Sequence, residues 1–311
     1  MVRLRGVMAA AVTGVVILGA LLAPAATAAP VPPTAPPPAR PPVGAWAPAA
    51  TAALHPGVVT ETAGGGACTT NFVFTGGDRT FLGQAAHCAG TGGATEINGC
   101  DSGTGPVGTP VVIKASDGTD RTGTLAYSSW VTMQDNGESD PDTCAYNDFA
   151  LVEIDAADAD DVNPGVPFFG GPTGIDTDGL PPGETVHTYG NSPLRGGIGG
   201  LSPKVGVGAG DAGGVRSHEV YTISPGVPGD SGSAFLDGDG DAVGILSTLN
   251  LSPLPVSNGV SDLALALDYA NANGGLGDIE MALGTEPFTA TPPGIPPTAV
   301  APPAGPPLPP L

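Results

Sequence analysis

The chain has 311 residues, room for one large domain or two small ones, and a formal net charge of −21. This charge argues against binding to nucleic acid, whose phosphates need a basic surface. Only 13% of the residues are charged, and 50 glycines and 36 prolines favour short strands joined by turns over long helices.

Residues 1–29 are typical of a secretory signal. Arg3 and Arg5 precede an apolar run over 7–22, and the small residues Ala26 to Ala28 suit a cleavage site. Because the run is slightly shorter than the ~20 residues that span a bilayer, we favour cleavage over a retained anchor. The sequence predicts a secreted chain with no stable membrane insertion after signal cleavage.

Residues 30–57 form a Pro- and Ala-rich stretch, which we interpret as a linker or short propeptide. A hairpin is then predicted from the β-prone runs 71–75 and 80–83, with a turn over 76–78. Its second strand leads into His87.

Four cysteines in an exported chain predict two disulfides, with three possible pairings. None forms a Cys-x-x-Cys pair, so zinc is not indicated, and we expect no metal and no cofactor. We favour Cys68–Cys88, which would staple the hairpin, contribute about 3 kcal/mol and fix His87 in place. Cys100 and Cys144 form the second predicted pair. The other histidines (His55, His187, His218) have no comparable setting.

Asp148 precedes an apolar, β-prone run over 149–154 and could lie desolvated at the mouth of that strand, facing a histidine. Further strands are predicted over 185–189, 219–222, 234–236 and 242–246. The acidic turn between the last two, at 237–241, lacks the sixth-position glycine and distal glutamate of a calcium loop, so we favour a plain hairpin turn.

A helix capped by Ser261 and Asp262 should end near Asn273 and Gly274. Residues 286–311 are Pro-rich, and we expect a disordered tail.

The sequence Gly229-Asp230-Ser231-Gly232 is a candidate nucleophile turn. Glycines allow a strained turn and the close approach of a substrate carbonyl. A serine hydroxyl needs a base and a group that orients that base, together with backbone N–H donors for the developing oxyanion.

Three segments occur in the order His, Asp, Ser: Ala85-Ala86-His87-Cys88, Asp148 before Phe149-Ala150-Leu151, and Gly229 to Gly232. They resemble the signature segments of chymotrypsin-like (trypsin-fold) serine proteases of the secreted bacterial type. The spacing of Cys68 and Cys88 also resembles that family's histidine-bracketing disulfide. The resemblance covers about residues 60–285. It implies an all-β fold of two antiparallel six-stranded β-barrels, over 58–165 and 166–285, with the active site between them and a C-terminal helix.

The resemblance also implies a mechanism. Ser231 would attack the scissile carbonyl of a protein or peptide and form an acyl-enzyme, with His87 as general base and Asp148 orienting the imidazole. The N–H groups of Gly229 and Ser231 would form the oxyanion hole. We expect a monomeric endopeptidase. The alternatives are a catalytically silent binding module of the same fold and an esterase-like hydrolase with the same triad.

The chain departs from the family pattern at several positions. Gln84 replaces a threonine, Ser233 replaces a common glycine, and no Arg-Ile-Val-Gly-Gly-like activation sequence occurs. Asp230 would therefore need an internal cation, for which Arg195 and Arg216 are candidates.

The family's substrate pocket corresponds to two segments here (Pro225, Gly226, Val227, Pro228 and Ser247, Thr248, Leu249). No aspartate lies at its base, and no histidine follows Ser231. Leu249 stands where a glycine often keeps the pocket open. The resemblance therefore implies a shallow pocket for small or medium apolar side chains.

Overall fold

The computed structural model describes residues 46–93, 96–250 and 256–291. Within these residues, no helix combines the length and apolar character needed to cross a lipid bilayer. The predicted signal segment 1–29, the first part of the predicted linker and the end of the predicted tail lie outside the described residues.

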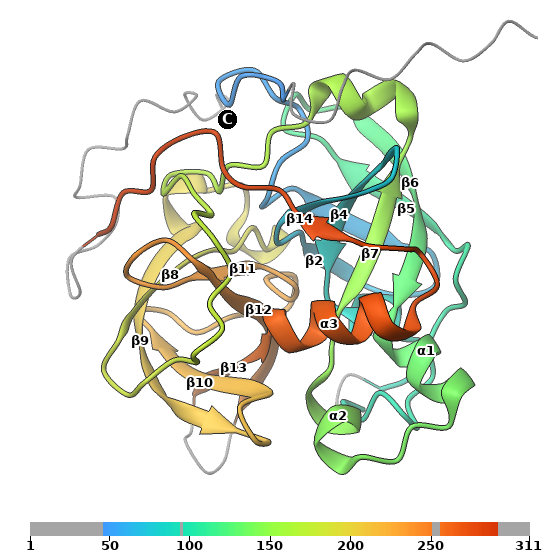
Figure 1. Ribbon diagram of the computed structural model, residues 1–311. Helices are drawn as coiled ribbons and strands as arrows, with labels where there is room; N and C mark the ends of the chain where they lie inside the picture. The colour runs from blue at the N-terminus through green and yellow to red at the C-terminus, as the bar shows by residue number, and fades with distance from the viewer. Residues whose placement is uncertain (1–45, 94–95, 251–255, 292–311) are drawn as a thin grey trace, which may run out of the picture. The chain divides into compact units, whose positions relative to one another are not determined.

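The first of two β units is an antiparallel sheet with the order β14-β3-β4-β7-β6-β5-β1-β2 (Figure 1). The edge strand β14 comes last in the sequence and pairs with β3. The strands are Val59–Thr62 (β1), Ala67–Thr69 (β2), Val73–Gly76 (β3), Arg79–Gln84 (β4), Pro110–Lys114 (β5), Asp120–Ser128 (β6), Ala150–Ile154 (β7) and Glu280–Met281 (β14).

The second unit is a closed barrel with the order β10-β13-β12-β11-β8-β9. Each strand pairs with two neighbours around the ring, although the end of β12 extends past its pairing with β11. The strands are Thr185–Tyr189 (β8), Pro203–Ala212 (β9), Ser217–Thr222 (β10), Ala234–Leu236 (β11), Ala242–Asn250 (β12) and Ser257–Asp262 (β13).

The helices are short. They are α1 (Ser129–Asn136), α2 (Pro141–Tyr146) and α3 (Leu263–Asn273), with 3₁₀ turns at Ala86–Ala89 (η1), Ala156–Asp161 (η2), Pro193–Arg195 (η3) and Gly199–Leu201 (η4). The C-terminal helix α3 contacts β12, β13 and α1. The Asp262 carboxylate caps it by accepting from the Leu265 N–H, so the helix and its cap are confirmed.

One hydrophobic cluster contains residues of both units. The cluster includes Phe74 from β3, Phe149 directly before β7, Leu236 and Ile245 from the barrel, and Leu263 from α3, and none of these is exposed. Burying a side chain of this size stabilises the fold by about 1.5–3 kcal/mol. The two β units therefore share part of their core.

The predicted all-β fold with two β units and a C-terminal helix is confirmed, as is the six-stranded second barrel. The first unit differs from the predicted six-stranded barrel, because it has eight strands in an order that does not return on itself. The additional strands are the short edge strands β2 and β14, with three and two residues.

Strand β9 was not predicted, since glycines interrupt its apolar pattern. At Gly208, an added Cβ would lie 2.8 Å from the side chain of Leu180, and at Gly206 it would collide with the Tyr221 backbone. These glycines allow close approach of neighbouring chain, which is a common reason for glycine within a strand.

Ordered structure extends beyond both ends of the predicted folded region. Leu54, in the predicted linker, is fully buried and bridges to Val162. Thr291, in the predicted tail, is buried against His187, whose Nε2 accepts from the Thr291 N–H at 3.0 Å. The described parts of both segments therefore pack against the two β units.

Candidate active site

His87 lies in η1, directly after β4, and the disulfide Cys68–Cys88 ties this turn to β2. Asp148 lies between α2 and β7, and the second disulfide, Cys100–Cys144, holds α2. Both predicted disulfides are present. Each disulfide therefore restrains the segment next to one of the two candidate catalytic residues, His87 or Asp148.

The Asp148 carboxylate holds His87 at two points. Its Oδ2 lies 2.6 Å from His87 Nδ1, and its Oδ1 accepts from the His87 backbone N–H at 2.8 Å. An ionised carboxylate can only accept, so Nδ1 carries the proton and Nε2 is left with a free lone pair. This is the tautomer that a general base at Nε2 requires.

Ser247 is a further partner of Asp148. Its Oγ donates to Asp148 Oδ2 at 2.6 Å. Ser247 lies where the register between β12 and β13 shifts, between Leu246 and Thr248, and such bulges re-aim side chains. The sequence analysis predicts Ser247 as part of the substrate pocket, and the structure adds that its hydroxyl binds Asp148.

Burial and pairing oppose each other at His87 and Asp148. Burial favours the neutral form of each group, but the charge and hydrogen bond of Asp148 outweigh it and raise the pKa of His87. In the same way, burial would raise the pKa of Asp148, but His87 and Ser247 lower it overall. Asp148 is therefore ionised near neutral pH.

Removing the Ser247 hydroxyl should destabilise the fold. A hydrogen bond to a charged group contributes about 1.5–3 kcal/mol, so we expect Ser247→Ala to lower the free energy of unfolding by that amount in urea titrations. Ser116→Ala is the matched control, because the Ser116 hydroxyl donates to a neutral carbonyl, that of Ala52, and its loss should cost about 0.5–1.5 kcal/mol. Equal losses of unfolding free energy in Ser247→Ala and Ser116→Ala would contradict a charged partner for the Ser247 hydroxyl.

Ser231 lies on a barrel loop that packs against the first sheet. The Ser231 carbonyl accepts from the Thr69 N–H at 2.8 Å, and the Gly232 carbonyl accepts from the Asn71 amide at 3.0 Å. A Cβ at Gly232 (φ +84°) would lie 2.9 Å from the backbone N of Ala85. The loop thus lies against the chain two residues before His87.

The Ser231 side chain is half-buried. Among the described residues, its hydroxyl makes no hydrogen bond to His87. Serine–base hydrogen bonds in ligand-free enzymes are often long and tighten when substrate binds. The structure therefore brings His87 and Asp148 into direct contact and places the Ser231 loop beside them.

Backbone donors in this loop alternate between paired and free. The Asp230 N–H bonds to the Val227 carbonyl at 2.8 Å, and the Gly232 N–H bonds to the Leu246 carbonyl at 2.7 Å. Within the described part of the chain, the N–H groups of Gly229 and Ser231 have no backbone or side-chain acceptor. Two free donors on alternate residues suit the binding of an oxyanion.

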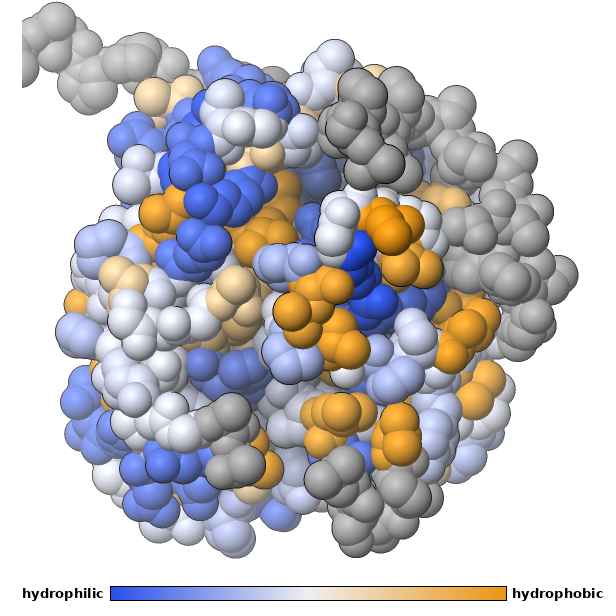
Figure 2. Space-filling view, turned by 180° about the vertical axis from the view of Figure 1, so that it is seen from behind, coloured by the Kyte–Doolittle hydropathy of each residue, from blue (hydrophilic) through white to orange (hydrophobic). Residues whose placement is uncertain are grey.

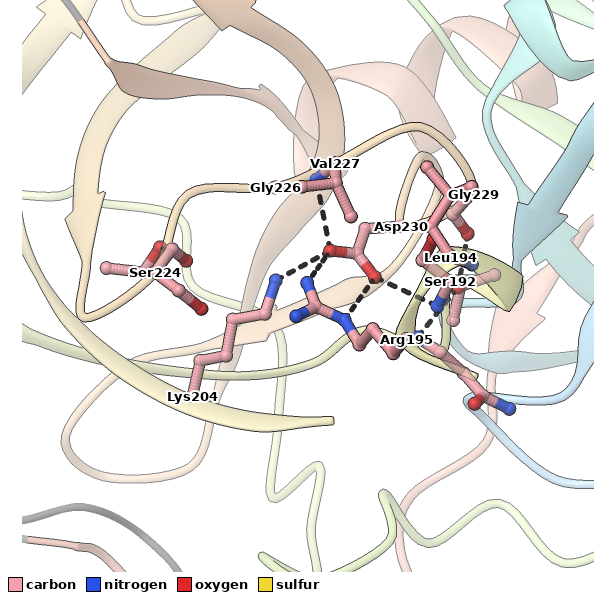
Figure 3. A network of polar contacts seen from close by, with 12 residues as sticks. Ser192, Leu194, Arg195, Lys204, Ser224, Gly226, Val227, Gly229 and Asp230 are labelled. Atoms are coloured by element: carbon pink, nitrogen blue, oxygen red, sulfur yellow. Dashed lines mark hydrogen bonds and ion pairs between the residues drawn. The ribbon is translucent and has the colours of Figure 1, made fainter. Parts of the chain in front are cut away.

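Asp230 is fully buried beneath this loop, and Figure 3 shows its partners converging on the carboxylate. Arg195 contacts both oxygens, and Lys204 Nζ donates to Oδ2 at 2.7 Å. The N–H groups of Ser192 and Val227 donate at 3.0 and 3.1 Å. Burial would raise the pKa of Asp230, but Arg195 and Lys204 outweigh burial and lower it.

The sequence offered two candidate cations for Asp230, and only Arg195 binds it. Arg216 instead lies 3.9 Å from the carboxylate of Asp140. Sequence reasoning missed Lys204, although the chain has only one other lysine, Lys114. A buried acid that needs a cation could have directed attention to so rare a residue.

The predicted pocket segments differ in exposure. Gly226 is buried, and a Cβ there would lie 2.7 Å from Leu246, which the sequence had not assigned to the site. Its N–H donates to the Asn258 side chain at 2.8 Å. Pro225 and Val227 are half-buried, Pro228 is exposed, and Thr248 bonds to Asn250 at 2.9 Å. Leu249 is 47% exposed.

Among the described residues, most of the large exposed apolar side chains belong to the second half of the chain: Leu194, Ile198, Leu201, Val215, Tyr221, Ile223, Leu249, Val256 and Leu283. Figure 2 shows groups of apolar side chains set among polar ones on the face opposite to that of Figure 1. Leu194 lies in η3, next to Pro193, which packs against Gly229. Exposed apolar surface therefore begins close to the Ser231 loop.

His87 lies within 4.8 Å of the sulfurs of Cys68 and Cys88, a grouping that resembles a metal site in its residue types. The two sulfurs are bonded to each other in a disulfide. Metal-binding cysteines must be thiolates, so these three residues do not form such a site.

No protein-family model matches the chain, and no curated protein matches its sequence. Among solved structures, it is similar to protease A of Thermobifida fusca, with 19% identity and a TM-score of 0.46, over 75% of this chain and 100% of that one. It is similar to Nocardiopsis protease, with 15% identity and a TM-score of 0.41, over 73% of this chain and 98% of that one. A glutamic acid specific serine protease shows 19% identity and a TM-score of 0.43, over 70% of this chain and 98% of that one.

Proposed function

We propose that the chain is a secreted serine endopeptidase of the chymotrypsin-like family, with Ser231, His87 and Asp148 as its triad. The observation that carries this proposal is the paired contact of Asp148 with the ring and backbone of His87, at 2.6 and 2.8 Å. A buried carboxylate on Nδ1 prepares Nε2 to accept a proton. The Ser231 loop, packed beside this pair, offers the hydroxyl.

In the proposed reaction, Ser231 Oγ attacks the scissile carbonyl while its proton passes to His87 Nε2. The oxyanion accepts from the Gly229 and Ser231 N–H groups. His87 then gives the proton to the leaving amine, and the acyl-enzyme remains. A water molecule then attacks the ester carbonyl while its proton passes to His87, and His87 returns that proton to Ser231 Oγ as the ester bond breaks, which releases the acid and restores the Ser231 hydroxyl.

A peptide substrate is supported by the edge of β12. Pairing with β11 ends at Ile245, opposite Ala234, whereas pairing with β13 continues to Asn250. Among the described strands, the segment from Ser247 to Asn250 therefore pairs only with β13, and its other edge has no strand partner. An extended peptide can add to such an edge through backbone hydrogen bonds. Leu249 stands where a glycine often keeps the family's pocket open, so its side chain favours substrates with small or medium apolar side chains at that pocket.

The pairing of Asp230 supports activity without an N-terminal activation step. Two side-chain cations and two backbone N–H groups already satisfy the carboxylate. No newly cleaved N-terminus is needed to neutralise it. The two disulfides support secretion, because such bonds persist in oxidising compartments.

A fluorophosphonate probe tests the proposal directly, because it phosphonylates an activated serine. We expect one probe per folded wild-type chain, with the adduct mapped to Ser231 by mass spectrometry, and no adduct on Ser231→Ala. Folded wild-type protein that does not react would contradict the proposal and favour a catalytically silent binding module. Labelling with turnover of esters but not of peptides would indicate an esterase.

The pH dependence of kcat/KM should follow His87. The base must be neutral, and Asp148 raises its pKa above the usual 6.5. Activity should therefore fall as pH decreases through a midpoint above 6.5, and Asp148→Asn should shift this midpoint to lower pH. Values of kcat/KM measured from about pH 5 to about pH 9 would show this fall in activity and its midpoint. A midpoint that is the same in both proteins would contradict the role of Asp148.

A further inference from the structure

The buried group beneath the Ser231 loop contains more positive than negative charge. Asp230 is its one acid, with a side chain that is 0% exposed, and both Arg195 (11% exposed) and Lys204 (4% exposed) pair with it. Among the described residues, neither cation has a second acidic partner. Two cations and one anion give the group a formal charge of +1.

The second cation is not needed to satisfy Asp230. Arg195 contacts both carboxylate oxygens, and the Ser192 and Val227 N–H groups supply further donors. Burying an additional ammonium group carries a desolvation penalty of several kcal/mol. Consistent with that penalty, burial lowers the pKa of Lys204 despite the opposing effect of Asp230. A charge retained at such a cost suggests a role beyond pairing.

The position of the group suggests that role. Asp230 lies between Gly229 and Ser231, the residues with free N–H groups, and adjacent Cα atoms are about 3.8 Å apart. An oxyanion at those donors would form close to the Asp230 carboxylate, whose negative charge opposes it. Arg195 alone would cancel this charge, whereas Arg195 and Lys204 together reverse it.

We propose that Lys204 is a positioning residue that holds Asp230 and supplies buried positive charge behind the oxyanion site, and so stabilises the tetrahedral intermediate without touching substrate. This inference rests on the proposed function. Fixed charge in a site shielded from water acts over longer distances than in bulk solvent. Its effect should therefore appear in binding of the tetrahedral state rather than of the substrate.

The test compares Lys204→Met with Lys114→Met, which changes the only other lysine, a partly exposed residue paired with Glu61 and Asp120. The readouts are the inhibition constant of a peptidyl boronate, which forms a tetrahedral anionic adduct with serine, and kcat and KM for a peptide. We expect Lys204→Met to weaken the boronate and lower kcat by about tenfold, as for a unit charge roughly 10 Å away at an effective dielectric constant of about 20. KM should stay within about twofold, and Lys114→Met should match wild type.

Two further variants separate charge from packing. Lys204→Gln is neutral but can still donate to Asp230, so it should resemble Lys204→Met, and it replaces that variant if the latter does not fold. Lys204→Arg keeps the charge and should retain most of the boronate affinity. The inference would be overturned if Lys204→Met or Lys204→Gln bound the boronate as tightly as wild type does. It would also be overturned if Lys204→Arg lost as much boronate affinity as Lys204→Gln. Absence of a boronate adduct on wild type would instead contradict the proposed function, and this inference with it.

Discussion

Ser231→Ala is expected to lower kcat for peptide hydrolysis by about 10⁶-fold, the size of effect seen when the nucleophile of a serine protease triad is removed. Without Oγ, no acyl-enzyme can form, and His87 has no hydroxyl proton to accept. A residual rate above that in water should persist, because the free N–H groups of Gly229 and Ser231 remain. Progress curves with a chromogenic peptide would measure the loss.

The same variant should fold as stably as wild type. The Ser231 hydroxyl has no hydrogen-bond partner among the described residues, whereas its backbone carbonyl, which accepts from Thr69, is unaffected by the substitution. We expect a change within about 0.5 kcal/mol in the free energy of unfolding. Ser139→Ala, at an exposed loop position, serves as the control and should retain full activity. Wild-type turnover by Ser231→Ala would show that another group is the nucleophile.

Site residues that lie next to a recognisable local pattern, such as a strand or a cysteine, were predictable from the sequence. His87 follows a predicted strand and stands directly before Cys88, and Asp148 precedes an apolar strand, so each had flanking residues that indicated its place. The hairpin, the strands β8, β10, β11 and β12 and the capped helix α3 were predicted for the same reason. Local patterns such as alternation, turns and caps act over a few residues and can be read directly.

Partners distant in sequence were not predictable in this way. Ser247 binds Asp148 across 99 positions, and its orientation depends on a register shift between β12 and β13. Arg195 and Arg216 were equivalent candidates for Asp230 until the fold placed Arg195 in η3, next to Ser192, whose N–H also binds the carboxylate. Lys204 lies in a glycine-rich strand whose pattern did not predict a strand. Such contacts follow from barrel closure and register, which local patterns do not specify.

Asp230→Asn is expected to destabilise the fold more than Ser247→Ala does. It removes the one negative charge and leaves Arg195 and Lys204 buried without a counterion. Removing one partner of a buried ion pair typically costs about 3–5 kcal/mol, which urea titration would detect. Asp239→Asn, at an exposed turn position, is the matched control and should change the unfolding free energy by less than about 0.5 kcal/mol.

The pH dependence of stability should identify the charge as the cause. The pKa of Asp230 is lowered in the folded protein, so its ionised form stabilises the fold above the unfolded value of about 3.9, and this contribution is lost as pH falls below it. Asp230→Asn has no such carboxylate, so its disadvantage relative to wild type should shrink below about pH 4. A constant difference across that range would point to packing rather than charge.

A double-mutant cycle with Lys204 measures the coupling between the two buried charges. In the wild-type background, Lys204→Met removes a partner of Asp230, whereas in Asp230→Asn it removes an uncompensated buried cation. We therefore expect Lys204→Met to recover part of the stability lost in Asp230→Asn, with a coupling energy of about 0.5–3 kcal/mol. Strict additivity of the two changes would show that the two charges do not stabilise each other, and the retention of Lys204 beneath the Ser231 loop would then need another cause.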